Sequence, residues 1–326
     1  MKKYLILIVI ISVFFACSDD NPKRVELTGS VFGTTYKIIY LGDSKDYSKS
    51  IDSIFDVTNN SVSTYIPNSL ISKVNKGDTT IEIDTIFKEV FIKSKEIFVE
   101  SHGFFDPTVG SLVNAYGFGP KKTKLDLTQN QIDSIMNFVG LDKVSLKNSQ
   151  IIKSNSNVYL DFNSIAKGFG IDLVARFFED QGINNYLVEI GGEIRTKGAK
   201  EEGKPWVIQV VNPVDADNNG GYTKINLSDK SMATSGNYRK FRIADNGIKY
   251  VHTVNPKTGL AQESNLLSAS VIAASDCADV DAYATAIMAM GLEKAKVFLE
   301  KRPDLKVILI YSDSNNELKE YSNLNQ

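Results

Sequence analysis

Two oxygen-bearing side chains in the last third of the chain have the spacing of a site for a hard metal ion. Asp281 and Thr285 are four residues apart in an apolar stretch, so a helix would place them on one face, a turn apart. A carboxylate and a hydroxyl in that arrangement can reach one Mg²⁺ ion, which binds one or two carboxylates and completes its shell with water and substrate phosphates. A charge near a helix N-terminus gives the same pattern, so both interpretations stay open. Asp279 would point away from this face and is not expected to bind the ion.

Residues 161–172, DFNSIAKGFGID, bring a carboxylate, a lysine and two glycines together at the predicted start of a helix. Asp161 follows an alternating run that is typical of a strand end, and apolar residues recur after it at helical spacing. Small residues in the first turn let a phosphate approach the backbone N–H groups, and Lys167 adds a positive charge beside them. A well-capped amphipathic helix with a solvated lysine is the alternative interpretation.

His252 is one of two histidines and stands where a predicted strand meets the turn signature Asn-Pro-Lys-Thr-Gly. A histidine at a strand end that faces a cleft can accept a hydroxyl proton near neutral pH. A structural hydrogen bond is the alternative role. The other histidine, His102, precedes a glycine in a polar loop and is predicted to lie on the surface. Cys277, ahead of an apolar helix, is predicted to be a buried small hydrophobic residue rather than a nucleophile.

The first 16 residues have the form of a signal peptide. Lys2 and Lys3 precede an apolar run over 4–16, which is too short to span a bilayer. The run ends in Phe-Phe-Ala-Cys, which resembles a bacterial lipobox, so cleavage before Cys17 and lipidation of its thiol are expected. An ordinary cleaved signal is the alternative. We predict export and a lipid anchor in a bacterial membrane, facing the periplasm, and the Ser-Asp-Asp after Cys17 leaves surface exposure open.

The composition bounds the class of protein. The chain has 326 residues, of which 42% are hydrophobic, and a formal net charge of −2. No cluster of lysine and arginine stands out, which argues against nucleic-acid binding. With Cys17 lipidated only Cys277 would remain, so no internal disulfide can form and core packing must hold the fold. We divide the chain into the signal peptide (1–16), the lipidated cysteine with a linker (17–24) and one large domain (25–326).

The hydrophobic pattern predicts interleaved helices and strands without an internal repeat. The expected helices lie at 48–58, 86–101, 110–116, 127–138, 165–177 and 276–301, the last with a break at Gly291. The expected strands lie at 25–40 (broken near Gly29 and Gly33), 143–146, 158–160, 186–190, 206–211, 224–227, 249–254, 267–273 and 307–311. Strand-rich segments between a few long helices predict an α+β (mixed α/β) fold, with helices packed on twisted sheets.

Eight short blocks follow one another along most of the chain. They are FGTTYKI from Phe32, STYIPNSLISKVN from Ser63, GFFDPTVGSLVNAYGFG from Gly103, DFNSIAKGFGID from Asp161, VEIGGEIRTKG from Val188, ATSGNYRKF from Ala233, HTVNPKTG from His252 and DAYATAIMAMG from Asp281. In this order the blocks resemble the ApbE family of FAD:protein FMN transferases. The first block departs from the family, which usually has methionine where this chain has Phe32. The resemblance implies a two-subdomain fold with largely antiparallel sheets.

The resemblance also implies a metal ion and the residues that handle the diphosphate. The implied Mg²⁺ ligands are the side chains of Asp281 and Thr285 and backbone oxygen at Ser164 and Ala166. Lys167 would help to orient the phosphates, and His252 would border the diphosphate or the acceptor threonine as a candidate proton acceptor.

A flavin needs flat apolar surface on its ring and polar groups at its edges. From the residues alone, aromatic side chains in the loops are either core plugs or ring-stacking groups. Glycine turns are expected at 191–193 and 234–237, either as tight β-turns or as sites of close backbone approach. The resemblance favours Tyr65 as the stacking platform and Asp106 as a partner of a polar edge. The residues implied to contact FAD are Phe32, Thr34, Tyr65, Phe104, Phe105, Asp106, Asp161, Lys167, Glu193, Thr234, Ser235, Gly236 and His252.

The implied activity is Mg²⁺-dependent transfer of FMN from the substrate FAD to a threonine hydroxyl of a target protein, with release of AMP. The expected acceptor carries a Ser/Thr-Gly-Ala-Ser/Thr-type segment, as in subunits of sodium-pumping quinone reductases or related electron-transfer complexes. An FAD pyrophosphatase that yields FMN and AMP is one alternative, and a non-catalytic flavin-binding lipoprotein is another. The Asp281 and Thr285 pair argues against mere binding, because storage needs no metal on the diphosphate.

Overall fold

The computed structural model describes most of the chain beyond the predicted signal peptide. The described residues are 22–42, 44–120, 126–213, 221–237, 241–243, 247, 249–261 and 264–324. The predicted signal peptide (1–16), Cys17 and most of the predicted linker (17–24) lie outside them. Within the described ranges, no helix is long and apolar enough to cross a membrane.

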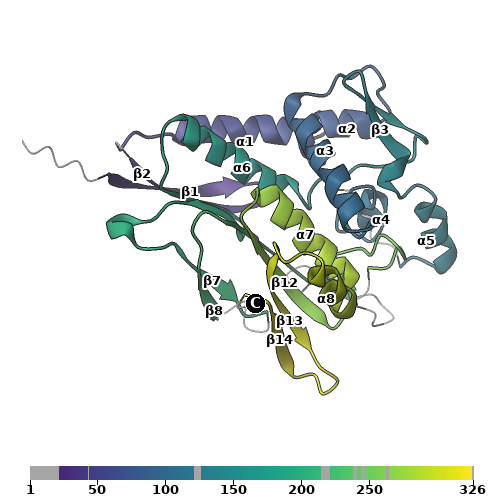
Figure 1. Ribbon diagram of the computed structural model, residues 1–326. Coiled ribbons are helices and arrows are strands. Elements are labelled where there is room, and N and C mark those ends of the chain that lie inside the picture. Colours follow the sequence, from purple (N-terminus) through teal and green to yellow (C-terminus); the bar gives the residue numbers. More distant parts are fainter. Residues whose placement is uncertain are drawn as a thin grey trace, which may run out of the picture.

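Eight strands form one antiparallel sheet, in the order β1-β2-β5-β6-β9-β12-β13-β14 (Figure 1). They are β1 (Lys23–Val31), β2 (Thr34–Gly42), β5 (Tyr186–Ile190), β6 (Glu193–Lys197), β9 (Ser231–Gly236), β12 (Leu266–Ala273), β13 (Lys306–Ser312) and β14 (Leu318–Ser322). The turn between β1 and β2 is Phe32-Gly33, where both φ angles are positive (51° and 75°), as a two-residue hairpin turn requires. The predicted break near Gly33 is this turn. Gly29 instead continues β1, where an added Cβ atom would lie 2.6 Å from the Tyr36 ring.

Alternating side chains give the sheet two buried faces. In β13, Val307 and Leu309 belong to the large hydrophobic core on the helical side. Ile308 and Ile310 belong to a second core on the opposite side, which the hairpin of β7 (Val207–Val211) and β8 (Gly221–Asn226) covers. This period of two is that of a strand covered on both faces.

The helices of this part lie on the other side of the sheet, where α6 and α7 pack directly on the strands (Figure 1). They are α1 (Ser48–Val62), α2 (Leu70–Asn75), α3 (Thr85–Glu100), α6 (Ala166–Asp180), α7 (Cys277–Met290) and α8 (Leu292–Glu300). All residues of α7 except Asp279 and Thr285 are buried, since this helix packs against α6, β9 and β12. Gly291, with a φ of 73°, separates α7 from α8 at the predicted break.

A smaller group of elements has a core of its own. Tyr116, Leu112 of α4 (Gly110–Ala115) and Tyr250 of β11 (Lys249–Val251) share a third hydrophobic cluster, against which α5 (Gln129–Met136) packs. α5 begins with a capping box at Thr128, where the helix was predicted to open. Two further short strand pairs are β3 (Val144–Lys147) with β4 (Gln150–Lys153), and β10 (Phe241–Ile243) with β11.

The predicted α+β fold, with helices on largely antiparallel sheets, is confirmed. The strand predicted at 158–160 is wrong, because only an isolated bridge to Val109 forms there. The Asn75 side chain explains the difference. Its amide bonds both the N–H and the C=O of Leu160, each at 2.8 Å, in the place of a neighbouring strand. The turn expected at 234–237 is also wrong, because most of that segment belongs to β9 in the middle of the sheet.

Candidate active site

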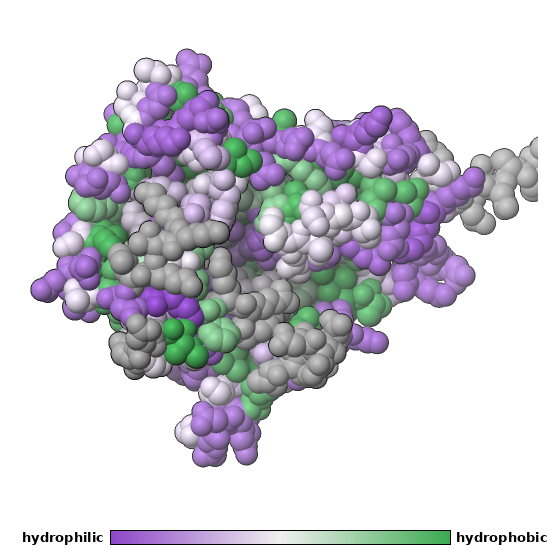
Figure 2. Space-filling view, turned by 180° about the vertical axis from the view of Figure 1, so that it is seen from behind, coloured by the Kyte–Doolittle hydropathy of each residue, from purple (hydrophilic) through white to green (hydrophobic). Residues whose placement is uncertain are grey.

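Two connected cavities lie beside α6 and α7. The first cavity has a volume of about 320 Å³ and the second of about 640 Å³. Val113, Asn163, Lys167 and His252 line both, so the two form one continuous site. Volumes of roughly 300–1,000 Å³ are typical of small-molecule sites. The face shown in Figure 2 is hollowed near its middle, and hydrophobic residues lie beside the hollow.

The first cavity is built on the crossing of α6 and α7. Gly168 of α6 lies against the start of α7, where an added Cβ atom would be 2.4 Å from the Cys277 carbonyl oxygen. The Asp172 carboxylate accepts hydrogen bonds from the N–H groups of Cys277 (2.8 Å) and Ala278 (2.9 Å), and so caps α7 from outside the helix. Arg195 of β6 lies 2.6 Å from this buried carboxylate and balances its charge. These contacts fix the position of α7 relative to α6.

α7 presents both predicted metal ligands to the first cavity. Asp281 and Thr285 line it together, as their spacing on a helix predicts. The Asp281 Oδ2 atom accepts a hydrogen bond from the Gly168 N–H (3.2 Å), and the Thr285 hydroxyl is 3.3 Å from the Ser235 hydroxyl of β9. Burial raises the pKa of Asp281 to about 7, although the Lys167 ammonium acts in the opposite direction. A cation at this carboxylate would favour its charged form.

The donor set fits a hard divalent cation. Oxygen atoms of Asp281, Thr285 and Ser235 line the first cavity, where the hydroxyl groups of Thr285 and Ser235 are 3.3 Å apart, and Mg²⁺ prefers oxygen ligands. The described part of the chain holds no group of three His, Cys, Asp or Glu side chains that could bind a metal ion, so an ion here would keep water or substrate oxygens as ligands. Backbone oxygen at Ser164 and Ala166 is also predicted to bind the ion. Ser164 lines the first cavity and Ala166 lines the second.

Two acidic residues that precede Asp281 on or beside α7 are engaged elsewhere. Asp276 and Asp279 lie 3.0 and 2.8 Å from the Lys93 ammonium of α3, and Asp276 also lies 2.6 Å from Arg195. Asp279 therefore helps to attach α7 to α3 and does not line the cavity.

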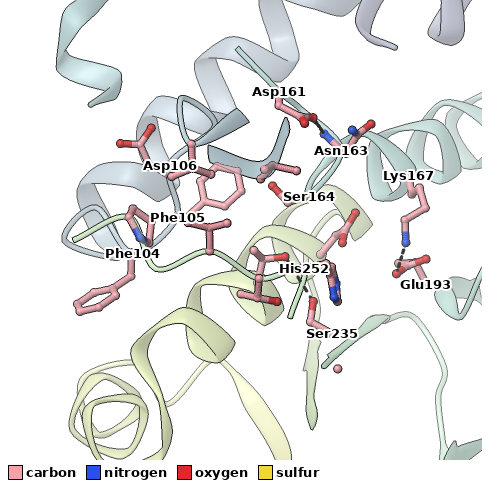
Figure 3. Close-up of a pocket in the computed structure, with 18 of the residues that line it drawn as sticks. Phe104, Phe105, Asp106, Asp161, Asn163, Ser164, Lys167, Glu193, Ser235 and His252 are labelled. Carbon is pink, nitrogen blue, oxygen red and sulfur yellow. Dashed lines mark hydrogen bonds and ion pairs between the residues drawn. The ribbon is translucent and has the colours of Figure 1, made fainter. Parts of the chain in front are cut away.

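Lys167 carries a positive charge at the junction of the two cavities. Its Nζ atom lies 2.6 Å from Glu193 Oε1 (Figure 3). Glu193 is buried, and its other carboxylate oxygen has no hydrogen-bond partner within the described part of the chain. Burial would lower the pKa of Lys167, but the carboxylates of Glu193 and Asp281 outweigh it and raise the pKa. The ammonium therefore stays charged and can meet an anionic group of a ligand.

His252 follows β11 and faces the same junction. It is half-buried and lines both cavities, and Figure 3 shows its ring within the site. A histidine in this position can exchange a proton with a hydroxyl group that enters the site. His102, in contrast, is exposed on the surface, as predicted.

The structure brings most of the predicted site residues together. Those that line the first cavity are Phe104, Phe105, Asp106, Asp161, Ser164, Lys167, Glu193, Thr234, Ser235, Gly236, His252, Asp281 and Thr285. Those that line the second are Phe32, Tyr65, Ala166, Lys167 and His252. Thr34 lines neither cavity, because it stands on the far side of the β5–β6 turn beside Gly191.

The four predicted aromatic residues differ in how they face the site. Tyr65 is 53% exposed and Phe32 is half-buried, and both line the second cavity. Phe105 is buried in the large core, and the ring of Phe104 points away from the centre of the site in Figure 3. Tyr65 and Phe32 are therefore the better placed of the four to contact a flat ring in the second cavity.

Two predicted carboxylates also hold the loops that form the cavity wall. Asp106 Oδ1 accepts hydrogen bonds from the N–H (2.8 Å) and hydroxyl (2.6 Å) of Thr108, whose oxygen in turn accepts one from the Gly140 N–H (2.6 Å). Burial raises the pKa of Asp106. Asp161 Oδ1 accepts a hydrogen bond from the Asn163 N–H at 2.9 Å (Figure 3). Both carboxylates thus shape the cavity that they line.

The small residues of the DFNSIAKGFGID segment have a different role from the one expected. Gly168 packs against the backbone of α7. Gly170 lies beneath the Phe32 ring, where a Cβ atom added to Gly170 would be 2.7 Å from a ring carbon. Both glycines are buried by protein and are closed to a phosphate. The part of the segment that is open to a ligand lies around Ser164 and Lys167.

Sequence reasoning missed other residues of the site. Asn163 lines both cavities, and its place two residues after Asp161, within the same segment, was the signal that could have found it. Val113 lies at the junction on α4, and Thr253 lines the first cavity after His252. A small apolar residue on a short helix carries no chemical signal, so Val113 could not have been found from its type.

Comparison with known proteins identifies the family. A sequence model of the ApbE family matches residues 32–309. The chain belongs to the ApbE family. A relative from Haemophilus influenzae named FAD:protein FMN transferase is 35% identical over 331 residues, which cover 97% of this chain and 95% of that protein. A relative of the same name from Vibrio cholerae is 31% identical and covers 99% of this chain and 97% of its own length.

Solved ApbE structures share the fold. The flavin transferase ApbE from Vibrio cholerae superposes with a TM-score of 0.82 at 32% identity, over 93% of this chain and 98% of that one. The apo flavinyl transferase ApbE from Pseudomonas stutzeri superposes with a TM-score of 0.83 at 26% identity, over 94% and 96% of the two chains. The ApbE resemblance of the eight sequence blocks is therefore confirmed.

Proposed function

We propose that this chain is a Mg²⁺-dependent FAD:protein FMN transferase, which joins the FMN part of FAD to a threonine hydroxyl of an acceptor protein and releases AMP. One observation carries the proposal: Asp281, Lys167 and His252 line a single cavity. Asp281 supplies a carboxylate for a metal ion, Lys167 a positive charge for phosphate, and His252 a proton acceptor. Full-length relatives named FAD:protein FMN transferase support the same activity.

The proposed reaction is attack of the threonine oxygen on the phosphorus of the FMN half of the diphosphate. A new P–O bond forms to threonine, the bridging P–O bond breaks, and the electron pair leaves with AMP. A Mg²⁺ ion at Asp281 and Thr285 would supply neutralising charge at the diphosphate oxygens. Lys167 binds and orients the diphosphate, and His252 takes the hydroxyl proton.

The second cavity suits the ring system of the flavin. Tyr65 and Phe32 offer aromatic surface there, and a flat conjugated ring stacks on such surface. FAD that spans both cavities would have its diphosphate near their junction, beside Lys167 and His252. FAD bound in this way would have its reacting phosphorus next to Lys167 and His252.

The proposed acceptor is an exported protein with a Ser/Thr-Gly-Ala-Ser/Thr-type segment, of the kind found in sodium-pumping quinone reductases and related electron-transfer complexes. A lipid anchor at Cys17 would hold the enzyme on the same side of the membrane as such subunits. Cleavage and lipidation are read directly by the mass of the N-terminal peptide from the membrane fraction. An unmodified Cys17 would remove the anchor from the proposal but leave the enzyme activity untouched.

The test of the activity is FMN transfer measured by intact-mass spectrometry. The full chain is incubated with FAD, Mg²⁺ and a purified acceptor domain that carries the threonine motif. We expect the acceptor to gain one FMN unit, the gain to disappear with EDTA, and excess Mg²⁺ to restore it. An acceptor in which the threonine is replaced by valine is the matched control and should gain nothing.

Two other results would point to the alternatives. Free FMN and AMP without a modified acceptor would show a pyrophosphatase, because water would then take the place of threonine at the same phosphorus. FAD that stays bound and intact would show a binding protein.

His252→Asn should keep FAD binding and slow transfer by about 100-fold or more, in the range for loss of general-base catalysis.

A further inference from the structure

A second concave surface adjoins the first cavity on the side of α8. We define this α8 surface by six of its lining residues: His102, Phe104, Lys294, Val297, Phe298 and Lys301. It encloses about 380 Å³ and is mostly apolar. None of the diphosphate-handling residues of the proposed reaction lines it, so it is separate from the groups that act on FAD.

The α8 surface combines exposed apolar area with unpaired positive charge. Val297 on α8 is 56% exposed. The Lys294 ammonium lies 5.4 Å from the centre of the Phe104 ring, and Lys301 adds a second cation to the surface. Lys257 stands beside the surface, with its ammonium 5.8 Å from the centre of the same ring. None of these three lysines forms a salt bridge with another described residue, and the single acid of the surface, Glu293, pairs with Lys296.

This surface is continuous with the catalytic cavity. Phe104 lines both. Lys257 stands on the loop that begins at His252, five residues further along the chain. An extended polypeptide spans about 3.3 Å per residue, so a segment bound on the α8 surface can place a hydroxyl residue a few positions away beside His252.

We propose that the α8 surface docks the acceptor protein, through a segment beside the modified threonine that carries acidic and apolar side chains. The inference rests on the proposed function and adds the chemistry of the partner. Acidic residues complement the unpaired lysines, and an apolar residue covers the Val297 and Phe298 side of the surface. Lys294, Val297 and Lys301 line neither of the two cavities, so FAD bound in the cavities would leave these residues open to another partner.

The first experiment separates acceptor docking from FAD binding. Full-length wild type, Lys294→Glu and Val297→Asp are compared for the KM of an acceptor domain with an acidic flank beside its threonine, and for the Kd of FAD. We expect each substitution to raise the acceptor KM by about tenfold, the effect of losing one good interfacial contact, with the FAD Kd unchanged. Lys49→Glu, which reverses an exposed lysine on α1, is the matched control and should change neither value.

A reciprocal charge exchange sharpens the test. An acceptor whose flanking acids are replaced by lysine should be a poor substrate for wild type and should recover with Lys294→Glu. Unchanged acceptor KM values for both variants would overturn the proposal while leaving FMN transfer by wild type intact. No FMN on any acceptor with wild type would instead remove the proposed function, and the docking surface with it.

A membrane is the other partner that a basic and apolar surface could meet. Full-length Cys17→Ser, which carries no lipid on residue 17, is tested for binding to phosphatidylglycerol vesicles. We expect Lys294→Glu in this background to leave vesicle binding unchanged. Loss of vesicle binding together with an unchanged acceptor KM would assign the surface to anionic lipid and overturn acceptor docking.

Discussion

The diphosphate end and the ring end of the proposed site are built in different ways. At the crossing of α6 and α7, Asp281 is 3% exposed and the two backbones touch at Gly168. At the second cavity, Tyr65 is 53% exposed on the loop between α1 and α2. A close-packed region transmits any change to its neighbours, whereas a loop side chain can change alone. Asp281 and Lys167, which need fixed geometry for the chemistry, thus stand on closely packed helices.

This difference makes separable predictions for the two ends. Substitutions at the helix crossing should lower turnover or the free energy of unfolding. Substitutions at the ring end should weaken FAD binding and leave both of those quantities nearly unchanged. A substitution at one end with the effect expected at the other would show that the two ends do not differ in this way.

The largest effect is expected for Asp281→Ala. Loss of the buried carboxylate removes the one acidic side chain of the predicted metal site, so FMN transfer should fall by at least about 100-fold, as when a strong charge-stabilising group is lost. FAD binding, measured by flavin fluorescence, should largely remain. Asp279→Ala, on the same helix but paired with Lys93, is the control and should keep its turnover. Transfer that survives Asp281→Ala would show that the metal assignment is wrong.

Gly168→Ala should destabilise the whole protein. The added methyl group would lie 2.4 Å from a backbone oxygen of α7, which cannot move without the helix. Urea unfolding should show a loss of about 1–3 kcal/mol, the usual effect of overpacking a core. Gly42→Ala is the matched control, because its methyl group would lie 3.9 Å from the nearest side chain, that of Ile183. Equal stability of the two variants would mean that the helices are loosely packed at their crossing, which would contradict the close packing described above.

The sequence predicted the chemistry of the crossing better than its packing. The four-residue spacing of Asp281 and Thr285 predicts that both lie on one face of a helix, and both side chains do line the first cavity. The role of Gly168 could not be predicted. A glycine allows the close approach of either a phosphate or another helix, and the sequence is the same in both cases. Only the partner helix, more than 100 residues away, decides between them.

Elements in the sheet were harder to predict where polar side chains lie on strands. β9 carries Thr234, Ser235 and Gly236, which are typical of a turn, yet two neighbouring strands supply its backbone partners. Residues 158–160 show the opposite case. They have the alternating pattern of a strand, but the Asn75 side chain bonds the N–H and C=O groups of Leu160 in place of a neighbouring strand. Strand pairing depends on which segments meet in space, and a local pattern does not contain that information.

Tyr65→Ala tests the ring end and should have an intermediate effect. The side chain contributes aromatic surface to the second cavity, and its hydroxyl donates a long hydrogen bond of 3.4 Å to the Phe118 carbonyl oxygen. Loss of a stacking partner is worth about 0.5–1.5 kcal/mol, so the Kd of FAD should rise by up to about tenfold. Turnover at saturating FAD and urea stability should stay near those of wild type. Tyr65→Phe keeps the ring and should bind FAD normally; an equal loss in both variants would show that the hydroxyl, not the ring, matters.

The smallest effect is expected for Phe32→Met, which gives the chain the residue that ApbE proteins usually have at this place. Phe32 occupies a turn with positive φ, its ring lies over Gly170, and it meets the edge of the Phe55 ring at 5.6 Å. Methionine has a similar volume and adapts its shape, so it can fill the same space and should cost less than about 1.5 kcal/mol of stability. Titration calorimetry should show a change of less than about threefold in FAD affinity, since an apolar side chain of either kind can contact the ring. A loss of FAD affinity beyond tenfold would mean that this position tolerates substitution as poorly as the helix crossing does. The reason would be that the Phe32 side chain packs against Gly170 and Phe55, whereas Tyr65 is exposed.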